Sequence, residues 1–554
     1  MTSTQTTDTV TATPVAHIDD LAVGSMKMVR VDDHRLCLIR TSEGVFALDH
    51  ACPHEGYGLT QGALDGNLLT CAWHNWKFRV DDGACVVGEE DVTTHTATID
   101  DDGNVFVELH RPDIASQRPK LLSSLRRGIE HDYVGQISRD VVRLLQVDTN
   151  PGELVWEAVQ HGAPRAEFGW GHAVASATDC LRMVDLFEGD QRALPIVQAI
   201  AGIAEVDRDR PVNPLPDPLA QLPAEPLSEF RDAVETEQLE HAQALVRAAI
   251  HSGCDRDELR QWFTAVVSDH LLSYGHGAIY SQKAFELLDM IGWDRADTVL
   301  PYLVPTIVYG TREDVLPYTR PFMRMLADTD LAALATSPVD PTWRDDGTLL
   351  DILLGSDRRA IVPAVTTAIR DGAGVDGVLD VVVRTVGERM MRYDVAGEDD
   401  LLDDFGWLDI THGLTYANAA RWHHAHSADT GDTSGDTVRL ALFTAFLAQW
   451  TGRHEWHTKV AERDHGRSFG DATVTEAGEA LQREALLDNA SAFIVYAHGI
   501  KTSRAASIEA ARSDSMLPLQ AVARLLDSPR LERFVAANVA RSIEFLAGRA
   551  PRDD

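Results

Sequence analysis

The sequence of 554 residues has few cysteines, a deficit of basic residues and no long apolar run. Its six cysteines show no disulfide-framework spacing, which fits a reduced cytoplasm. Lys and Arg total 50 against 86 Asp and Glu, and the net charge of −36 repels nucleic acid and anionic membranes. No apolar run is long enough to span a bilayer, and Met1–Thr13 lacks the basic residues of a secretory signal. We therefore expect a cytoplasmic protein that binds neither nucleic acid nor membrane.

Four potential metal ligands stand close together near the amino terminus. Cys52 and His54 form a Cys-Pro-His triplet, and after sixteen intervening residues Cys71 and His74 enclose Ala-Trp. Two thiolates and two imidazoles can hold a [2Fe–2S] cluster, with one iron on the cysteines and the other on the histidines. A structural zinc site with mixed ligands is the alternative. The asymmetric spacing of the two pairs argues for the cluster.

The segment around these ligands resembles the Rieske family, in its ferredoxin and oxygenase branch. Gly62 and Gly66 supply turns between the two ligand loops. Respiratory Rieske domains carry an extra cysteine in each loop, whereas Cys37 and Cys85 lie outside both loops here. The resemblance implies a domain that passes electrons one at a time to a partner site. An NAD(P)H-dependent ferredoxin reductase is the expected electron donor.

The pattern of apolar residues along the chain changes near residue 110. Short β-like runs with Gly and Asp-Asp-Gly turns fill Val15 to His110, whereas later stretches such as Asp436–Trp450 show helical apolar spacing. We predict a multidomain α+β protein, in which a small all-β domain precedes a large all-α domain of irregular helical repeats. The expected parts are a flexible tail (1–13), the Rieske domain (14–110), a linker with the first helices (111–150) and a helical catalytic domain (151–554).

A nine-residue frame that begins with histidine recurs in the second region. It starts with His-Gly at His276, His412 and His498, and with His-Ala at His172. Small residues one and two turns further along the same face would let such helices approach closely, so the imidazoles would converge. Imidazole is a common iron ligand. We predict a mononuclear iron site on these four histidines; the alternative is that each is a turn residue bonded to the backbone of the next unit.

Lys501 occupies the fourth position of its frame, where the other copies have Ala175, Ile279 and Thr415. It shares a helix face with His498 and would point toward the converging histidines. An ammonium group beside a dication is disfavoured, so this lysine should be neutral. It would act as a base, or become a carboxylate-like ligand by carbamylation. An ordinary ion pair with an acidic residue is the alternative.

Other polar residues near these frames are assigned accessory roles or none. Asp409 precedes His412 by three residues and is the best candidate to orient that imidazole. Arg504 would hold the carbamate or a substrate oxygen by a charge-assisted hydrogen bond. Two further groups of histidines are expected on solvated surfaces: His423, His424 and His426, and His454 with His457. The alternative for the first group is an incidental metal binder, and for the second a metal site on a helix.

The stretch His-Gly-Ile-Lys-Thr-Ser-Arg-Ala at residues 498–505 is similar to the His-x-x-Lys-x-x-Arg-Ala segment of the questin oxidase-like family. Members of that family open or rearrange the rings of anthraquinone-type polyketides with dioxygen. The resemblance is distant and covers about residues 150–510. It implies a mononuclear non-haem iron held by several histidines, with the position of Lys501 as a carbamylated ligand. A fused Rieske domain is not expected of that family.

These features predict a Rieske-fused non-haem iron oxygenase. Electrons would pass from the cluster to the histidine-rich iron site, where O2 oxidises or cleaves a polycyclic, quinone-like small molecule as a mono- or dioxygenase. An ordinary Rieske oxygenase fits less well, because its catalytic domain is usually sheet-rich with two histidines and one carboxylate on iron. The alternative from another class is an electron-transfer protein whose helices form a docking or binding scaffold.

Overall fold

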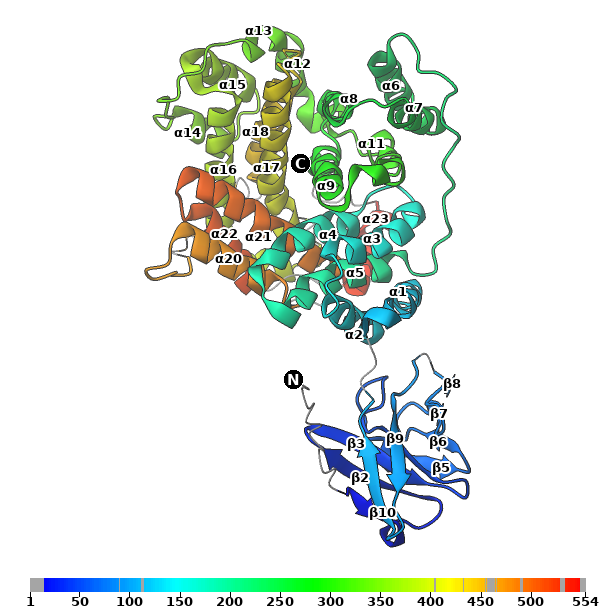
Figure 1. Ribbon diagram of the computed structural model, residues 1–554. Helices are drawn as coiled ribbons and strands as arrows, with labels where there is room; N and C mark the ends of the chain where they lie inside the picture. Colours follow the sequence, from blue (N-terminus) through cyan, green and yellow to red (C-terminus); the bar gives the residue numbers. More distant parts are fainter. Residues whose placement is uncertain are drawn as a thin grey trace, which may run out of the picture. The chain divides into compact units, whose positions relative to one another are not determined.

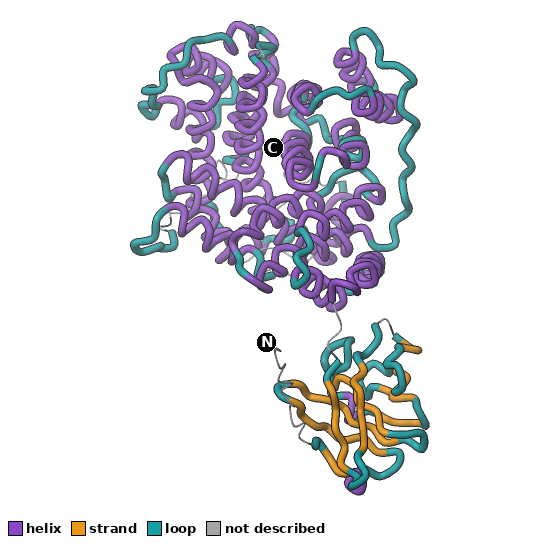
Figure 2. The backbone as a smooth tube through the Cα atoms, in the orientation of Figure 1, coloured by secondary structure: helices purple, strands orange, loops and turns teal. Residues whose placement is uncertain are grey.

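The chain forms a β-rich unit and a helical unit (Figure 1). The computed structural model describes residues 14–88, 90–110, 114–402, 405–431, 433–453, 455, 464, 466–488, 492–528 and 534–548. Unit 1 comprises Met1–Gly128 and Tyr133–Asp148, and unit 2 comprises Ile129–Asp132 and Thr149–Asp554. Figure 2 shows that the strands belong to unit 1 and that unit 2 is built from helices. The predicted fold class, a small all-β domain before a large helical region, is confirmed.

Two antiparallel sheets make up the β domain of unit 1. The six-stranded sheet has the order β1-β10-β9-β4-β3-β2, and the four-stranded sheet has the order β5-β6-β7-β8. The strands of the first sheet are β1 Ala16–His17, β2 Ser25–Val31, β3 His34–Arg40, β4 Val45–Asp49, β9 Thr94–Ile99 and β10 Asn104–Glu108. Those of the second sheet are β5 Ala63–Asp65, β6 Leu68–Thr70, β7 Lys77–Arg79 and β8 Cys85–Val87.

Strand β3 is buried on both faces and separates two apolar clusters. Alternate residues of a strand point to opposite sides, so Leu36 and Leu38 enter one cluster while Cys37 and Ile39 enter the other. The second cluster also contains Cys52 and other residues of the ligand loops. The loops that carry the predicted cluster ligands are therefore anchored in the core of the β domain.

Two helices follow the β domain, α1 Ile114–His131 and α2 Val134–Leu145. Unit 1 includes all of α2 and all but the last turn of α1. The side-chain amide of Gln136 donates to the carbonyl oxygen of Ser124 at 2.8 Å and so ties the two helices together. The finer boundaries that the sequence suggested at residues 110 and 150 stay predictions, and the tail 1–13 lies outside the described residues.

Unit 2 contains the remaining helices. Its first half has α3 Pro151–Gly162, α4 His172–Met183, α5 Ala193–Asp207, α6 Pro226–Glu235, α7 Leu239–His251, α8 Arg256–Asp269, α9 His276–Ile291, α10 Ala296–Val299, α11 Val304–Val308, α12 Arg320–Ala327 and α13 Leu331–Ala335. Its second half has α14 Thr348–Leu354, α15 Ile361–Ala368, α16 Gly374–Arg392, α17 Trp407–Thr430, α18 Asp436–Trp450, α20 Val474–Ala485, α21 Phe493–Ser513, α22 Leu517–Asp527 and α23 Phe534–Leu546.

Several helices begin where local capping chemistry predicts. Asn150 accepts a hydrogen bond from the backbone of Gly152, with Pro151 at the first position of α3. Asp255 accepts from the first backbone amides of α8. Thr473 and Glu476 form a reciprocal capping box at α20. None of the helices among the described residues is long and apolar enough to cross a membrane.

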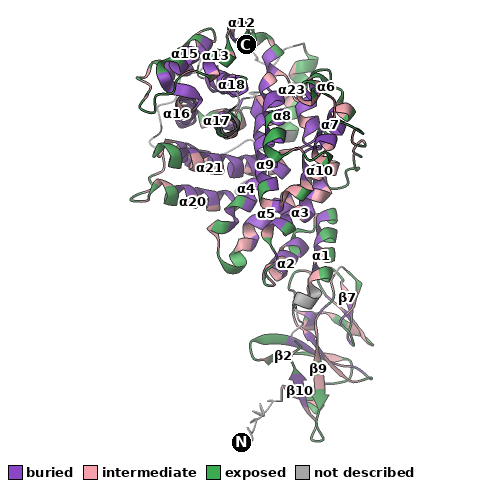
Figure 3. Cartoon of the chain, turned by 45° about the horizontal axis from the view of Figure 1, so that its top comes forward, coloured by how far each residue is buried: buried purple, intermediate pink, exposed green. Residues whose placement is uncertain are grey.

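Helices α4, α9, α17 and α21 pack against one another around a common centre. Each of them carries one of the repeated frames. Figure 3 shows α9 buried along most of its length, as expected for a helix enclosed on several sides. Gly275, which precedes α9, has φ +89°, and a Cβ added there would lie 2.3 Å from the Tyr416 ring of α17. The close approach of these two helices thus depends on glycine.

Candidate metal centres

The candidate cluster ligands of unit 1 lie on two loops of matching design. One loop follows β4 and the other joins β6 to β7. The backbone N–H of Cys52 donates to the carbonyl of Tyr57, and that of Cys71 donates to the carbonyl of Trp76, both at 2.8 Å. Each loop is therefore closed by the same bond, which spans five residues. This closure brings a cysteine and a histidine from each loop to one point.

The candidate sulfur ligands are buried, whereas His54 is half-buried and His74 is exposed to solvent. Cys52 and Cys71 are 2% and 3% exposed, whereas the side chain of His74 is 45% exposed. Burial raises the pKa of the Cys52 thiol to about 12, and the adjacent Cys71 adds to this effect. Thiolates here need the compensating charge of a metal, because ligand deprotonation and metal binding are coupled.

The two histidines meet edge to edge and are held by aromatic neighbours. Their ring centroids lie 4.5 Å apart at an interplanar angle of 80°. The ring of His54 stacks on Trp76 at 4.6 Å, and the ring of His74 meets Trp73 edge-on at 5.5 Å. Two paired thiols and two paired imidazoles fit the donor set of a [2Fe–2S] cluster with one histidine-ligated iron.

In unit 2, four histidines form a closed ring. Neighbouring imidazole centroids lie 4.9 Å apart for His172 and His276, 4.6 Å for His276 and His412, 4.9 Å for His412 and His498, and 4.5 Å for His498 and His172. His172 and His276 are the first residues of α4 and α9, and His412 and His498 lie in the second turns of α17 and α21. The structure therefore brings together all four histidines that the sequence frame singled out.

The nitrogens of this ring face one another without an intervening opposite charge. His412 Nε2 lies 2.9 Å from His276 Nε2 and 3.2 Å from His498 Nε2. Because His498 Nδ1 lies 2.6 Å from the carbonyl of Ile494, it must donate there, so its Nε2 carries a lone pair. One proton on His412 Nε2 can satisfy only one of its two neighbours. The nitrogen lone pairs that face one another at the centre of the ring would be stabilised by a cation.

The distances between these nitrogens match those of ligands around one ion. With metal–nitrogen bonds of about 2.1 Å, adjacent ligands lie about 3.0 Å apart in octahedral and about 3.4 Å apart in tetrahedral geometry. Desolvation lowers the pKa of His412 to about 3, and it also lowers the pKa of His172, His276 and His498 well below the usual value. All four imidazoles are therefore neutral, as metal ligands must be. The donor set fits a divalent transition metal.

Lys501 points into the ring, as its place in the frame predicts. Its Nζ lies 2.6 Å from His172 Nδ1 and 5.7 Å from the centroid of the Tyr280 ring. The side chain is buried, and burial lowers the pKa of Lys501 to about 7. A large share of this amine is therefore neutral near neutral pH.

A buried ion pair lies two helical turns behind the histidines. Lys283 Nζ binds Asp179 Oδ1 at 2.8 Å, and each residue follows its frame histidine by seven positions. Arg504 Nε lies 3.4 Å from the same carboxylate oxygen. Arg504, which the sequence analysis placed on a carbamate or substrate oxygen, thus pairs with Asp179, and its predicted role stays a prediction. The same holds for Asp409, which accepts from the backbone of Gly406 at 2.9 Å.

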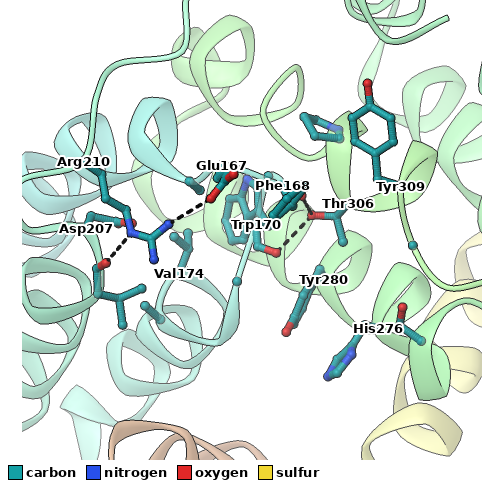
Figure 4. Close-up of a pocket in the computed structure, with 18 residues that line it drawn as sticks. Glu167, Phe168, Trp170, Val174, Asp207, Arg210, His276, Tyr280, Thr306 and Tyr309 are labelled. Carbon is teal, nitrogen blue, oxygen red and sulfur yellow. Dashed lines mark hydrogen bonds and ion pairs between the residues drawn. The ribbon is translucent and has the colours of Figure 1, made fainter. Parts of the chain in front are cut away.

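A pocket of about 330 Å³ reaches the histidine ring from solvent. Figure 4 shows His276 and Tyr280 at one end and Arg210 with Asp207 at the other. Arg210 pairs with Glu167 at 3.6 Å. The lining also includes the aromatic residues Phe168, Trp170 and Tyr309. An aromatic-walled pocket with a few polar groups is the usual form of a small-molecule site.

Tyr280 is the main residue at this site that sequence reasoning missed. Its ring stacks on His276 at a centroid distance of 4.9 Å and meets His172 edge-on at 5.9 Å. It stands at the fifth position of its frame, where the frame of His412 has Tyr416. That recurrence was a usable signal. A second usable signal was the pair Asp179 and Lys283, which stand at the same position of two frames and carry opposite charges.

One expectation about histidines outside the ring is wrong. His423 was predicted at the surface, but it is fully buried, and its two ring nitrogens contact Thr264 Oγ1 at 2.8 Å and the carbonyl of Ala278 at 3.2 Å. The error arises because α17 continues to Thr430, so the segment before the polar loop is helix core. His454 and His457 lie outside the described residues.

Comparisons with known proteins identify the amino-terminal region. Residues 11–98 match the family model of the Rieske [2Fe–2S] domain. The ferredoxin component of the alkene monooxygenase system of Xanthobacter autotrophicus is 32% identical over 77 residues, which are 14% of this chain and 63% of that protein. Cholesterol 7-desaturase of Hemicentrotus pulcherrimus is 33% identical over 75 residues, 13% of this chain and 16% of that protein. The amino-terminal region is thus a Rieske [2Fe–2S] domain, as predicted.

Solved structures match the same region. The ferredoxin of carbazole 1,9a-dioxygenase from Nocardioides aromaticivorans is 23% identical, with 18% of this chain and 99% of that chain covered and a TM-score of 0.17. The chain thus shares a small part of its own length with these proteins. The matches concern the Rieske domain and its electron transfer, an oxidoreductase function.

Proposed function

We propose that this protein is a Rieske-fused non-haem iron oxygenase. His172, His276, His412 and His498 would hold a mononuclear Fe(II), which receives electrons from the Rieske cluster. The observation that carries the proposal is the closed ring of neutral imidazoles, with nitrogens 2.9 and 3.2 Å apart, at the end of a pocket. Iron bound there would supply the redox chemistry by which O2 is activated.

The residues around the ring support distinct roles. The aromatic walls of the pocket suit a flat organic substrate, which would stack between Trp170 and Tyr280 beside His276. A polycyclic or quinone-like molecule meets this requirement. The pocket volume of about 330 Å³ is at the small end for ligand sites, so the substrate should be compact. His412 and His498 are buried and would hold the metal away from solvent.

Lys501 is proposed as a further ligand in carbamylated form. Its neutral amine would add to carbon dioxide with release of one proton, which yields a carbamate that offers anionic oxygen to iron. Because Nζ lies 2.6 Å from His172 Nδ1, a carbamate formed on it would lie beside the ring. Arg504 and Asp409 are proposed to support this site through their neighbours, Asp179 and the start of α17.

The electron supply follows from the Rieske domain. Two of its relatives are, by name, a ferredoxin of an alkene monooxygenase system and a cholesterol desaturase. By analogy, we propose that an NAD(P)H-dependent ferredoxin reductase reduces the cluster, in the cytoplasm. The competing proposal is an electron carrier whose helices serve as a docking scaffold. It is favoured by the ferredoxin relative, of which the matched segment covers 63%.

Iron and acid-labile sulfide, measured on one purified preparation, separate the two proposals. The oxygenase should hold about three irons and two sulfides per chain, because a mononuclear site adds one iron to the cluster. The carrier should hold two of each. His412→Ala should remove the extra iron, and His423→Ala is the matched control, since it alters a buried histidine of the same helix outside the ring. Two irons in the wild-type protein under iron-replete anaerobic conditions would reject the oxygenase.

A further inference from the structure

Helix α2 places two arginines beside a ligand loop of the Rieske cluster, within unit 1. Arg139 Nη1 donates to the backbone carbonyl oxygen of His54 at 2.6 Å. Arg139 Nε pairs with Glu90 Oε2 at 3.3 Å, and Arg143 binds the other oxygen of Glu90. His54 is itself a cluster ligand. The helix therefore contacts the main chain of the ligand directly and reaches the loop before β9 through Glu90.

Arg139 is the positive group of this contact that touches the main chain of the ligand loop. One carboxylate, Glu90, is shared by two guanidinium groups. A second carboxylate, Asp140, lies 3.6 Å from Arg143 on the same helix and also acts on Arg139. Arg139 directs Nη1 at the His54 carbonyl. Its side chain is 28% exposed and that of Glu90 is 13% exposed, so water screens this charge only in part.

A cation at this position favours the reduced cluster. Two ferric ions, two sulfides and two thiolates balance in charge, so the cluster that has gained one electron carries one net negative charge. A nearby positive charge stabilises that state more than the oxidised one. A strong hydrogen bond to the ligand backbone also fixes the loop, as residues behind metal ligands commonly do.

We propose that Arg139 is a positioning residue of the Rieske cluster, which orients the His54 loop and raises the reduction potential. A helix that follows the β domain in sequence would thus help to determine the reduction potential of the cluster in that domain. The inference concerns the Rieske domain and does not depend on the proposed oxygenase activity.

The test is the midpoint potential of the cluster in the full-length protein, by titration with detection of the paramagnetic signal. Arg139→Gln should shift the reduction equilibrium about threefold toward the oxidised form, which is about 28 mV lower at 59 mV per tenfold change. Arg139→Lys keeps the charge, so its midpoint potential should stay close to that of the wild type. Arg143→Gln is the matched control, because it removes the same charge from the same helix without touching His54.

Three outcomes would overturn the proposal. The first is an unchanged potential in Arg139→Gln, and the second is an equal shift in Arg143→Gln, which would indicate only general charge. The third uses Glu90→Gln, which leaves the Arg139 bond in place and removes its counter-charge. That variant should raise the potential, and a lowered or unchanged value would reject the idea even where Arg139→Gln does not retain its cluster.

Discussion

The candidate cluster ligands of unit 1 lie on two short loops, whereas the four histidines of unit 2 come from four separate helices. Each loop is closed by one backbone hydrogen bond, so its cysteine and histidine stay close whatever the rest of the chain does. The histidine ring exists only where α4, α9, α17 and α21 pack together. A locally closed site should therefore tolerate damage to the other unit, and a site closed by packing should be sensitive to its own helices.

The two centres also differ in their access to solvent. Of the two candidate cluster histidines, His74 has 45% of its side chain exposed and His54 is half-buried, which suits electron exchange with another protein. His412 and His498 are buried, and a pocket leads to His276 beside them. Burial keeps these imidazoles neutral and would keep water away from a metal bound there. The exposed site is suited to passing electrons on, and the enclosed one to binding a small molecule.

The largest expected effect is the selective loss of one centre. His276→Ala should abolish the mononuclear iron and lower total iron from about three to about two per chain, since a vacant position in the ring leaves the other nitrogens without a shared ion. The Rieske signal should persist. Iron analysis with paramagnetic resonance checks this. His423→Ala should change neither, and a simultaneous loss of the cluster in His276→Ala would contradict the independence of the two centres.

The reciprocal change sharpens the same comparison. His74→Ala should eliminate the Rieske signal, because the iron held by the two histidines loses a ligand. The whole cluster, with its two irons, should then be lost. The helical unit should stay folded and should keep its single iron. Metal content and the far-ultraviolet circular dichroism of the helices provide the measurement. Unfolding of the helices in this variant would show that the centres are not built separately.

A smaller effect is expected at Lys501, which lies beside the ring and is not one of its imidazoles. Lys501→Ala should weaken iron binding by about ten- to a hundredfold, the scale seen when groups around metal ligands are removed. Lys501→Glu should restore part of the affinity, because it supplies an anionic oxygen. Bicarbonate should speed reconstitution of the wild type only. Unaltered iron content and oxygen consumption in Lys501→Met would reject a ligand role.

The smallest effect concerns the far wall of the pocket. Burial raises the pKa of Asp207 to about 7. The unfolded chain ionises near pH 4 while the folded carboxyl stays protonated, so this group lowers the stability of unit 2 as pH rises from about 4 to about 7. At about 1.4 kcal/mol per pKa unit, the shift bounds the effect at about 4 kcal/mol. In Asp207→Asn, the melting temperature should depend less on pH over this range. An unchanged dependence on pH would contradict a protonated, buried carboxyl at Asp207.

The sequence by itself determined the Rieske domain, because Cys52, His54, Cys71 and His74 act through loops whose geometry is local. The sequence also identified the frame histidines, because a residue that recurs at fixed spacing on a helix face can be recognised in the sequence. Only the tertiary structure decided that these four rings meet, that Tyr280 stacks on His276 at the wall of the pocket, and that Asp179 pairs with Lys283. It likewise decided that His423 is buried and that Arg139 contacts His54. Contacts between distant segments depend on how helices pack, and the spacing of residues along one chain does not encode which faces will touch.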